Sequence, residues 1–127
     1  MTFPVKYSDT PSAKNFPGVP AENPKEVTYE EGVYVGYRYF NTFNVKPSYE
    51  FGFGKSYTSF DYSNIKISSP TFKDKIQVSV TVKNNGKVAG KEVVELYSSA
   101  PNKLIYKPKS ELKALQKRKN YSLVRVK

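Results

Sequence analysis

The sequence predicts a mainly β chain, a partial antiparallel sandwich preceded by an extended segment rich in Pro and Tyr. Three observations predict this fold class. Apolar and polar residues alternate over residues 76–83, turn residues separate the candidate strands at roughly ten-residue spacing, and five of the nine prolines lie within residues 1–26. A period of two indicates a strand with one face on a core, and strands separated by regular turns are typical of a β-sandwich.

The first 26 residues are expected to be extended and irregular, because proline fixes φ and lacks an N–H. Residues 27–47 combine β-branched and aromatic side chains, and Val33, Val35 and Tyr37 lie in one phase of an alternating pattern. This pattern favours a strand or a strand–turn element. A single buried helical turn around residues 36–40 is the alternative, since short apolar runs are ambiguous.

The next segment reads as a strand with a break in its pattern. Phe60 and Tyr62 lie in one phase, whereas Ile65 and Ile67 lie in the other. A one-residue slip of a period-two pattern predicts a β-bulge near residues 63–64.

Two further strands are expected around a turn. The apolar residues of 76–82 share one face, and residues 84–86, Asn-Asn-Gly, follow them with the turn chemistry of residues that tolerate positive φ. Residues 90–99 form the next predicted strand, with Val94 and Leu96 on one face.

The number of strands is small for a sandwich. Residues 109–116 hold Leu112 and Leu115 at a spacing that indicates either a weak helix or a poorly patterned strand. Because a sandwich needs about seven strands, either residues 27–47 contribute strands or the sandwich is incomplete.

Composition excludes several kinds of chemistry. The chain has no Cys and no His, so disulfides, zinc sites and Ser-His or Cys-His nucleophiles are excluded. We expect no metal and no cofactor. A run of about 18 apolar residues is absent from the sequence, so no membrane partner is expected.

The net charge of +10 belongs mainly to one end of the sequence. Residues 1–102 hold 12 basic and 10 acidic side chains, whereas residues 103–127 hold 9 basic and 1 acidic. This distribution indicates either a patch for an anionic polymer or a solvated lysine-rich segment. We favour the second interpretation and expect no nucleic-acid partner, because no nucleic-acid-binding motif accompanies the lysines.

Four blocks of the sequence resemble one enzyme family. They are "FPVKYSDTPSAKNFPG" (3–18), "YEEGVYVGYRYFNTFNVKPSYEFGFGKSYTSFDYSNIKIS" (29–68), "VSVTVKNNGKVAGKEVVELYSSAP" (78–101) and "KPKSELKALQK" (107–117). In order and spacing they are similar to the C-terminal region of bacterial glycoside hydrolase family 3 enzymes, the β-glucosidase group. The resemblance covers residues 3 to about 120.

The resemblance implies two parts with different origins. Residues 1–56 would be the irregular tail of the family's α/β sandwich domain and an interdomain strap. Residues 57–127 would be an immunoglobulin- or fibronectin type III-like sandwich. The family continues after its Glu-Leu-Lys block with a segment that "YSLVRVK" (121–127) does not match. We therefore expect the sandwich to be truncated.

The resemblance carries no catalytic residue over to this chain. Family members are retaining enzymes that use two opposed carboxylates, an Asp nucleophile in an N-terminal barrel and an acid/base in the α/β domain. Neither block is present, and Glu30, Glu31, Glu92 and Glu95 match no catalytic position. The expected catalytic set is empty, and the substrate-binding residues stay undefined.

The aromatic residues allow two interpretations. Tyr49, Phe51, Phe53 and Tyr57 surround Gly52 and Gly54, and Tyr34, Tyr37, Tyr39, Phe40 and Phe43 precede them. They could form a sugar-stacking face or pack against the family's α/β domain, and we favour packing. The two glycines are expected to allow tight backbone approach and positive φ.

The expected function is that of a non-catalytic C-terminal fragment of a β-glucosidase, which supports the catalytic domains of a periplasmic or secreted parent enzyme. Those missing domains are its expected partners, and self-association through open strand edges is a further one. The alternative is a stand-alone module that binds a polysaccharide or an acidic polymer.

Overall fold

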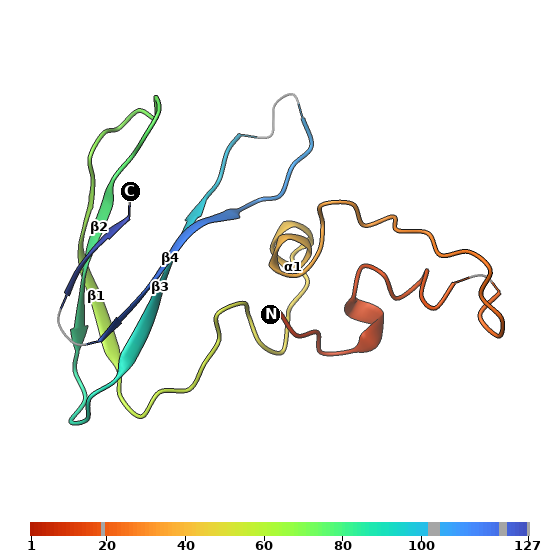
Figure 1. The fold of residues 1–127 in the computed structure, drawn as a ribbon, viewed down its shortest axis with the longest axis horizontal. Helices are drawn as coiled ribbons and strands as arrows, with labels where there is room; N and C mark the ends of the chain where they lie inside the picture. The colour runs from red at the N-terminus through yellow and green to blue at the C-terminus, as the bar shows by residue number, and fades with distance from the viewer. Residues whose placement is uncertain (19, 102–104, 120–121, 127) are drawn as a thin grey trace. The chain divides into compact units, whose positions relative to one another are not determined.

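The computed structural model describes residues 1–18, 20–101, 105–119 and 122–126 (Figure 1). The chain divides into two compact units. The N-terminal unit comprises Met1–Phe53 and Ser98–Glu111, and the sandwich unit comprises Gly54–Tyr97 and Leu112–Lys127.

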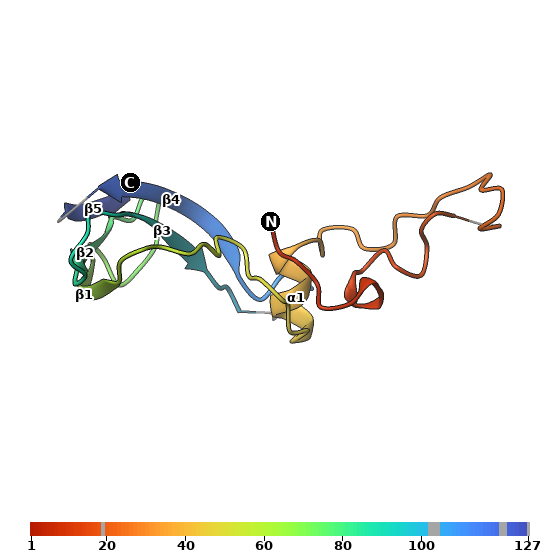
Figure 2. The ribbon, with the colours of Figure 1, turned by 90° about the horizontal axis from the view of Figure 1, so that it is seen from below.

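Residues 1–26, in their described part, are irregular, as predicted, and residues 27–36 are irregular as well. The described part of residues 1–36 contains one regular element, the short 3-10 helix η1 (Tyr7–Asp9) (Figures 1 and 2). Phe3 and Tyr49 form an isolated antiparallel bridge, in which the Phe3 N–H donates to the Tyr49 carbonyl at 2.9 Å. This bridge brings the start of the chain to the segment that follows the helix.

The strand predicted within residues 27–47 is wrong, because a helix, α1 (Tyr37–Phe43), stands there. It is longer than the single helical turn considered as the alternative. Gly36 begins it with φ 54° and ψ −137°, a backbone conformation open to glycine but not to most side chains. Asn44 ends it in the left-handed region and donates its N–H to the Phe40 carbonyl. The helix buries Phe40, which is 4% exposed.

The sandwich unit contains two sheets, which confirms the mainly β, antiparallel fold class. One sheet has the order β1 (Phe60–Ile67), β2 (Val78–Asn84), β5 (Ser122–Val126), with both pairs antiparallel. The other pairs β3 (Lys91–Ser98) with β4 (Glu111–Lys119) (Figure 1). For residues 109–116 the sequence indicated either a weak helix or a strand, and the structure has the strand β4 there.

The predicted β-bulge is present in β1. Ser63 pairs with Thr81 and Lys66 with Ser79, so the register shifts between Ser63 and Lys66. Asn64 takes φ 53° within this shift. Asparagine tolerates the left-handed region better than most residues, so the sequence supplies the residue that the bulge requires.

The core of the sandwich unit is small and centres on β2. Val80 and Val82 are 7% and 6% exposed, and Phe60 of β1 and Val94 of β3 pack against them. The predicted face of alternating apolar residues is thus confirmed. Val94 comes from the other sheet, so this cluster joins the two sheets.

The chain bends at residues 86–88, after Asn84 has ended β2, so the predicted turn at 84–86 overlaps the observed one only at Gly86. The expected reason for this glycine is wrong. Positive φ values occur elsewhere in the described chain, at residues such as Gly52 and Asn64, and not at this turn. A Cβ on Gly86 would lie 2.0 Å from Thr58 Oγ1 and 3.2 Å from Thr58 Cα. Close approach of two backbone segments therefore requires glycine here.

Truncation of the β2 core should weaken the fold measurably. We expect Val82→Ala to lower the free energy of unfolding by about 2 kcal/mol, because it removes two buried methyl groups and leaves a cavity. Urea unfolding followed by circular dichroism measures the change. Val88→Ala is the matched control, since Val88 is 49% exposed. Equal effects of both substitutions would show that this cluster is not the core.

Candidate functional site

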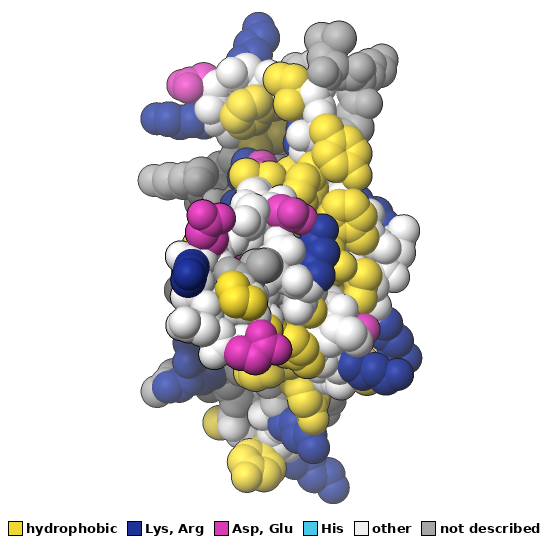
Figure 3. All heavy atoms as spheres, turned by 90° about the vertical axis from the view of Figure 1, so that its right-hand side faces the viewer, with side chains coloured by type: hydrophobic (Ala, Val, Ile, Leu, Met, Phe, Trp, Pro, Cys, Tyr) yellow, Lys and Arg dark blue, Asp and Glu magenta, His cyan; other side chains and the backbone are white. Residues whose placement is uncertain are grey.

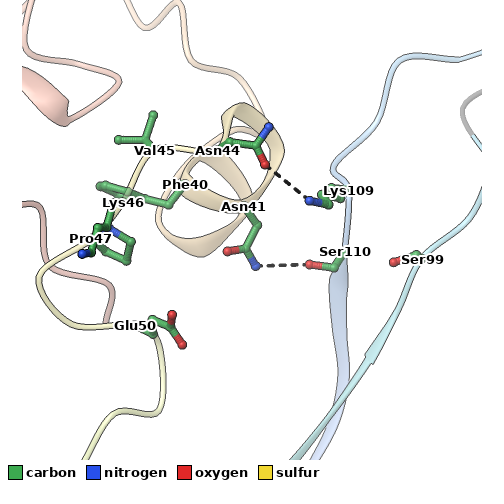
Figure 4. A pocket seen from close by; sticks show the side chains of 10 residues that line it. All are labelled: Phe40, Asn41, Asn44, Val45, Lys46, Pro47, Glu50, Ser99, Lys109 and Ser110. Atoms are coloured by element: carbon green, nitrogen blue, oxygen red, sulfur yellow. Dashed lines mark hydrogen bonds between the residues drawn. The ribbon is translucent and has the colours of Figure 1, made fainter.

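The N-terminal unit contains a hollow of about 480 Å³ beside α1, here called the α1 hollow (Figure 4). Its lining comes from α1, from the chain that follows it and from the segment Ser98–Glu111. The lining residues are Phe40, Asn41, Asn44, Val45, Lys46, Pro47, Glu50, Ser99, Lys109 and Ser110.

Hydrogen bonds fasten the Ser98–Glu111 segment to α1 at this hollow. Asn41 Nδ2 donates to Ser110 Oγ at 3.3 Å, and Lys109 Nζ donates to Asn44 Oδ1 at 3.4 Å (Figure 4). The Lys109 backbone N–H donates to Thr42 Oγ1 at 3.0 Å. Most polar groups at the α1 hollow therefore hold the unit together.

The α1 hollow lacks the groups for acid–base cleavage of a glycoside. Glu50 supplies the one carboxylate among its lining residues, which also include Lys46 and Lys109. A retaining glycosidase needs two carboxyl groups about 5 Å apart. Among the residues that the structure describes, groups of three or more potential metal ligands are likewise not found.

The aromatic residues around α1 pack mainly on one another. The ring centroids of Tyr34 and Phe43 lie 5.3 Å apart, those of Tyr39 and Phe43 5.1 Å, and those of Tyr34 and Tyr106 5.5 Å. Phe40 is buried beside them, but Phe43 and Tyr106 are 44% and 68% exposed. These aromatics thus form a cluster with an open apolar side.

The aromatic stretch 49–57 agrees with the packing interpretation in part. Tyr49 contacts the rings of Phe3 and Phe53, with centroids 6.2 and 4.9 Å away. Tyr57 is 101% exposed and does not pack within this chain. Gly52 takes φ 80°, as expected, whereas a Cβ at Gly54 would meet nothing within 4 Å, so the expectation for Gly54 is wrong.

The acidic residues named from the sequence lie in different places. Glu30 pairs with Lys14, which holds the pKa of that carboxyl below its usual range. Glu95 accepts a hydrogen bond from the Tyr97 hydroxyl at 2.8 Å. Glu92 and Glu95 stand three residues apart on β3, and after burial both carboxylates contribute to the raised pKa of the Tyr62 hydroxyl. Glu30 and Glu31 belong to the N-terminal unit.

A second pocket, of about 330 Å³, lies in the sandwich unit and is called the intersheet pocket. Its lining is mostly apolar and comes from β1, β2 and β3. The lining residues are Tyr62, Ile65, Val78, Val80, Val94, Glu95 and Leu96. The predicted apolar faces of β2 and β3 therefore meet here.

One polar link crosses between the sheets at this pocket. The Tyr62 hydroxyl of β1 donates to Glu92 Oε1 of β3 at 2.6 Å. Burial, together with this carboxylate, raises the pKa of Tyr62 above its ordinary value. The sequence placed Tyr62 in phase with Phe60, but no pattern along the chain pointed to Glu92 as its partner.

Comparison with known proteins finds relatives that match most of this chain. Thermostable β-glucosidase B of Acetivibrio thermocellus is 47% identical over 118 residues, which are 91% of this chain and 15% of that enzyme. Probable β-glucosidase I of Aspergillus niger is 43% identical over 123 residues, 92% of this chain and 14% of that enzyme. A search against protein-family models gives no match.

Solved structures agree with the sequence relatives. β-Glucosidase 3B of Thermotoga neapolitana, in complex with α-D-glucose, superimposes with a TM-score of 0.88 at 46% identity, over 98% of this chain and 18% of that one. The GH3 β-glucosidase of Bifidobacterium adolescentis superimposes with a TM-score of 0.85 at 33% identity, over 99% of this chain and 18% of that one.

The fold is thus that of a mainly β chain with two small sheets, and it matches one segment of larger proteins. Its relatives are glycoside hydrolase family 3 β-glucosidases, and the chain is homologous to a segment of these enzymes. It spans about 15% of the length of these curated relatives. In the described residues, no helix is long and apolar enough to cross a membrane.

The Tyr62–Glu92 hydrogen bond should stabilise the fold at neutral pH and lose this contribution in alkaline solution. Because the folded-state pKa of Tyr62 is raised, the contribution is present below the unfolded pKa of about 10 and is lost as pH rises beyond it. We expect Tyr62→Phe to lower the urea midpoint equally at pH values below about 9, with the difference shrinking above about 10. Tyr57→Phe, at a fully exposed ring, is the control. A Tyr62→Phe difference independent of pH would contradict the assignment.

Proposed function

We propose that the chain acts as a non-catalytic, supporting part of a family 3 β-glucosidase. Residues 1–56 would form the end of the α/β sandwich domain and the strap between domains, and residues 57–127 the fibronectin type III-like sandwich. The reactive carboxylates would lie outside the matched segment. The small share of each relative that the chain spans supports this proposal.

The single observation that carries the proposal is the apolar surface of the N-terminal unit. Phe40 and Pro108 are buried in this unit, while many large apolar side chains lie open (Figure 3). Those more than 40% exposed in Met1–Phe53 are Met1, Phe3, Val5, Tyr7, Phe16, Val27, Tyr29, Val33, Val35, Phe43, Tyr49 and Phe53. Exposed apolar surface on this scale is typical of an interface that another domain covers.

Polar atoms in the same unit support this interpretation. Glu31 Oε2, Tyr34 Oη and Arg38 Nε are buried and have no hydrogen-bond partner within the described chain. A buried polar group without a hydrogen-bond partner is unfavourable. Donors and acceptors on the catalytic domains would satisfy these atoms, so the catalytic domains are the proposed partners.

A complementation assay tests the proposal. A family 3 β-glucosidase, such as the Acetivibrio thermocellus relative, is shortened by its matching segment and then mixed with this chain. We expect the chain alone to leave a chromogenic β-glucoside intact, and the mixture to hydrolyse it faster than the shortened enzyme. Arg38→Ala should restore less activity, while Lys87→Ala, at an exposed turn of the sandwich unit, should restore as much as the unchanged chain.

Other results would point elsewhere. Hydrolysis by the chain alone would make it an enzyme in its own right. Failure to restore activity, combined with retention on insoluble glucan, would favour the stand-alone binding module instead. Loss of that retention at high salt would indicate an electrostatic partner.

In isolation, the chain is expected to associate with itself through open sheet edges. β1 is an outer strand of the three-stranded sheet, and in the described residues β3 and β4 pair with each other alone. Unpaired edges offer N–H and C=O groups to another chain, and lysine on an edge opposes such pairing. We expect the apparent mass in size-exclusion chromatography to rise with concentration, and Ile67→Lys, at a position 60% exposed, to reduce that rise. A concentration-independent monomer would argue against edge pairing.

A further inference from the structure

The turn after β2 carries the one Asn-Gly pair of the sequence, Asn85-Gly86. Asparagine followed by glycine is chemically labile, because glycine has no side chain to keep its backbone nitrogen away from the neighbouring carboxamide. Both residues are exposed to solvent. Gly86 is also fixed by sterics, since any Cβ would collide with Thr58. The fold therefore retains a labile pair at this position.

We propose that Asn85 is a deamidation site, and that the side chain of Asn84 controls its rate. In this reaction the Gly86 nitrogen, after loss of its proton, attacks Asn85 Cγ and forms a new C–N bond. The Cγ–Nδ2 bond breaks and ammonia leaves, which gives a cyclic succinimide. Water then opens the ring to aspartate or isoaspartate. The overall exchange is carboxamide plus water for carboxylic acid plus ammonia, so solvent is the one co-reactant.

The Asn84 carboxamide restrains the nucleophile of this reaction. The Gly86 N–H donates to Asn84 Oδ1 at 2.9 Å. That carboxamide is itself fixed, because it accepts from Thr58 Oγ1 and its Nδ2 donates to the Val88 carbonyl at 2.8 Å. A nitrogen whose N–H is engaged in this way loses its proton less readily and is directed towards Asn84 Oδ1. We call Asn84 and these three partners the Asn84 clamp.

The electrophile is restrained as well. Asn85 Nδ2 donates to Asp61 Oδ2, and the Asn85 backbone N–H donates to the Ser59 carbonyl at 2.9 Å. Attack on Cγ requires the carboxamide to leave Asp61. The folded turn thus holds both reacting groups, and opening of the clamp releases them.

Deamidation would place a second carboxylate against Asp61. Asp61 is the register partner of Lys83 at this end of β1 and β2, so the new negative charge would stand at the end of the ladder. Isoaspartate would in addition lengthen the backbone by one methylene between Asn85 Cα and the Gly86 nitrogen, which displaces the Gly86 N–H from Asn84 Oδ1. Both changes weaken the end of the β1–β2 pair.

Mass spectrometry of tryptic peptides tests the proposal on the full chain, incubated at mildly alkaline pH and sampled over time. We expect conversion at Asn85 to be slower in the folded chain than in urea. Asn84→Ala should accelerate conversion in the folded chain by about two- to tenfold, the range that corresponds to one lost hydrogen bond. Asn64-Ile65 and Asn44-Val45 of the same chain serve as internal references, because a bulky residue follows each Asn.

The variant Asn84→Asp distinguishes the effect of the Asn84 clamp on the rate of deamidation from the effect of a general loss of stability. This variant loses the donor to Val88 but keeps an acceptor for the Gly86 N–H, so its conversion should be as slow as that of the unchanged chain or slower. Equal acceleration by Asn84→Ala and Asn84→Asp would overturn the role of the clamp. Equal rates in the folded chain and in urea would also overturn it. If Asn84→Ala fails to fold, the rate of conversion at Asn85 is compared between Asn84→Asp and the unchanged chain. Faster conversion in Asn84→Asp contradicts the proposal.

The effect of deamidation on stability is measured with Asn85→Asp, which carries the same negative charge as the deamidated products. We expect its melting temperature to lie below that of the unchanged chain at low salt, and the gap to narrow at high salt, which screens repulsion between the two carboxylates. Asn85→Gln retains the amide and should melt close to the unchanged chain. A gap that does not depend on salt would exclude repulsion between residue 85 and Asp61 as its cause.

Discussion

The packing of Val80 and Val82 against Val94 is the contact on which the sandwich unit depends. These residues join the three-stranded sheet to the β3–β4 sheet, and Phe60 closes the same cluster. Beyond this cluster, the described unit buries little. Long apolar side chains such as Ile65 and Ile67 remain 68% and 60% exposed. Because burial of apolar area is the main favourable term in folding, a core this small leaves the unit dependent on each of its members.

The N-terminal unit has the opposite organisation, since its cohesion is largely polar and aromatic. Hydrogen bonds from Asn41, Thr42 and Asn44 to the segment Ser98–Glu111 replace a hydrophobic core. Its apolar side chains are mostly turned outward, and several of its polar atoms are buried without partners. This is the opposite of what an autonomous domain shows, and it agrees with homology to a segment of much larger enzymes.

The sequence predicted best where one rule dominated. The alternation over 76–82 and the phase slip near Asn64 follow directly from the period of a strand, and both are present in the structure. Prediction failed at residues 37–43, where the density of β-branched and aromatic residues indicated a strand. The structure has a helix there, because Gly36 can adopt the backbone conformation that begins it and rings such as those of Tyr39 and Phe43 pack on each other. The Tyr62–Glu92 bond joins residues 30 positions apart. Such pairs depend on how two sheets meet, which a local pattern does not contain.

The discontinuous make-up of the N-terminal unit has a practical consequence for domain dissection. Its two pieces, Met1–Phe53 and Ser98–Glu111, flank most of the sandwich unit along the chain. A single cut, whether by a protease or by a stop codon, cannot yield both units whole. A fragment that ended after residue 53 would leave Asn41, Thr42 and Asn44 without their partners in Ser98–Glu111. Anyone who wishes to study the helix alone must therefore graft the second piece onto it with a linker.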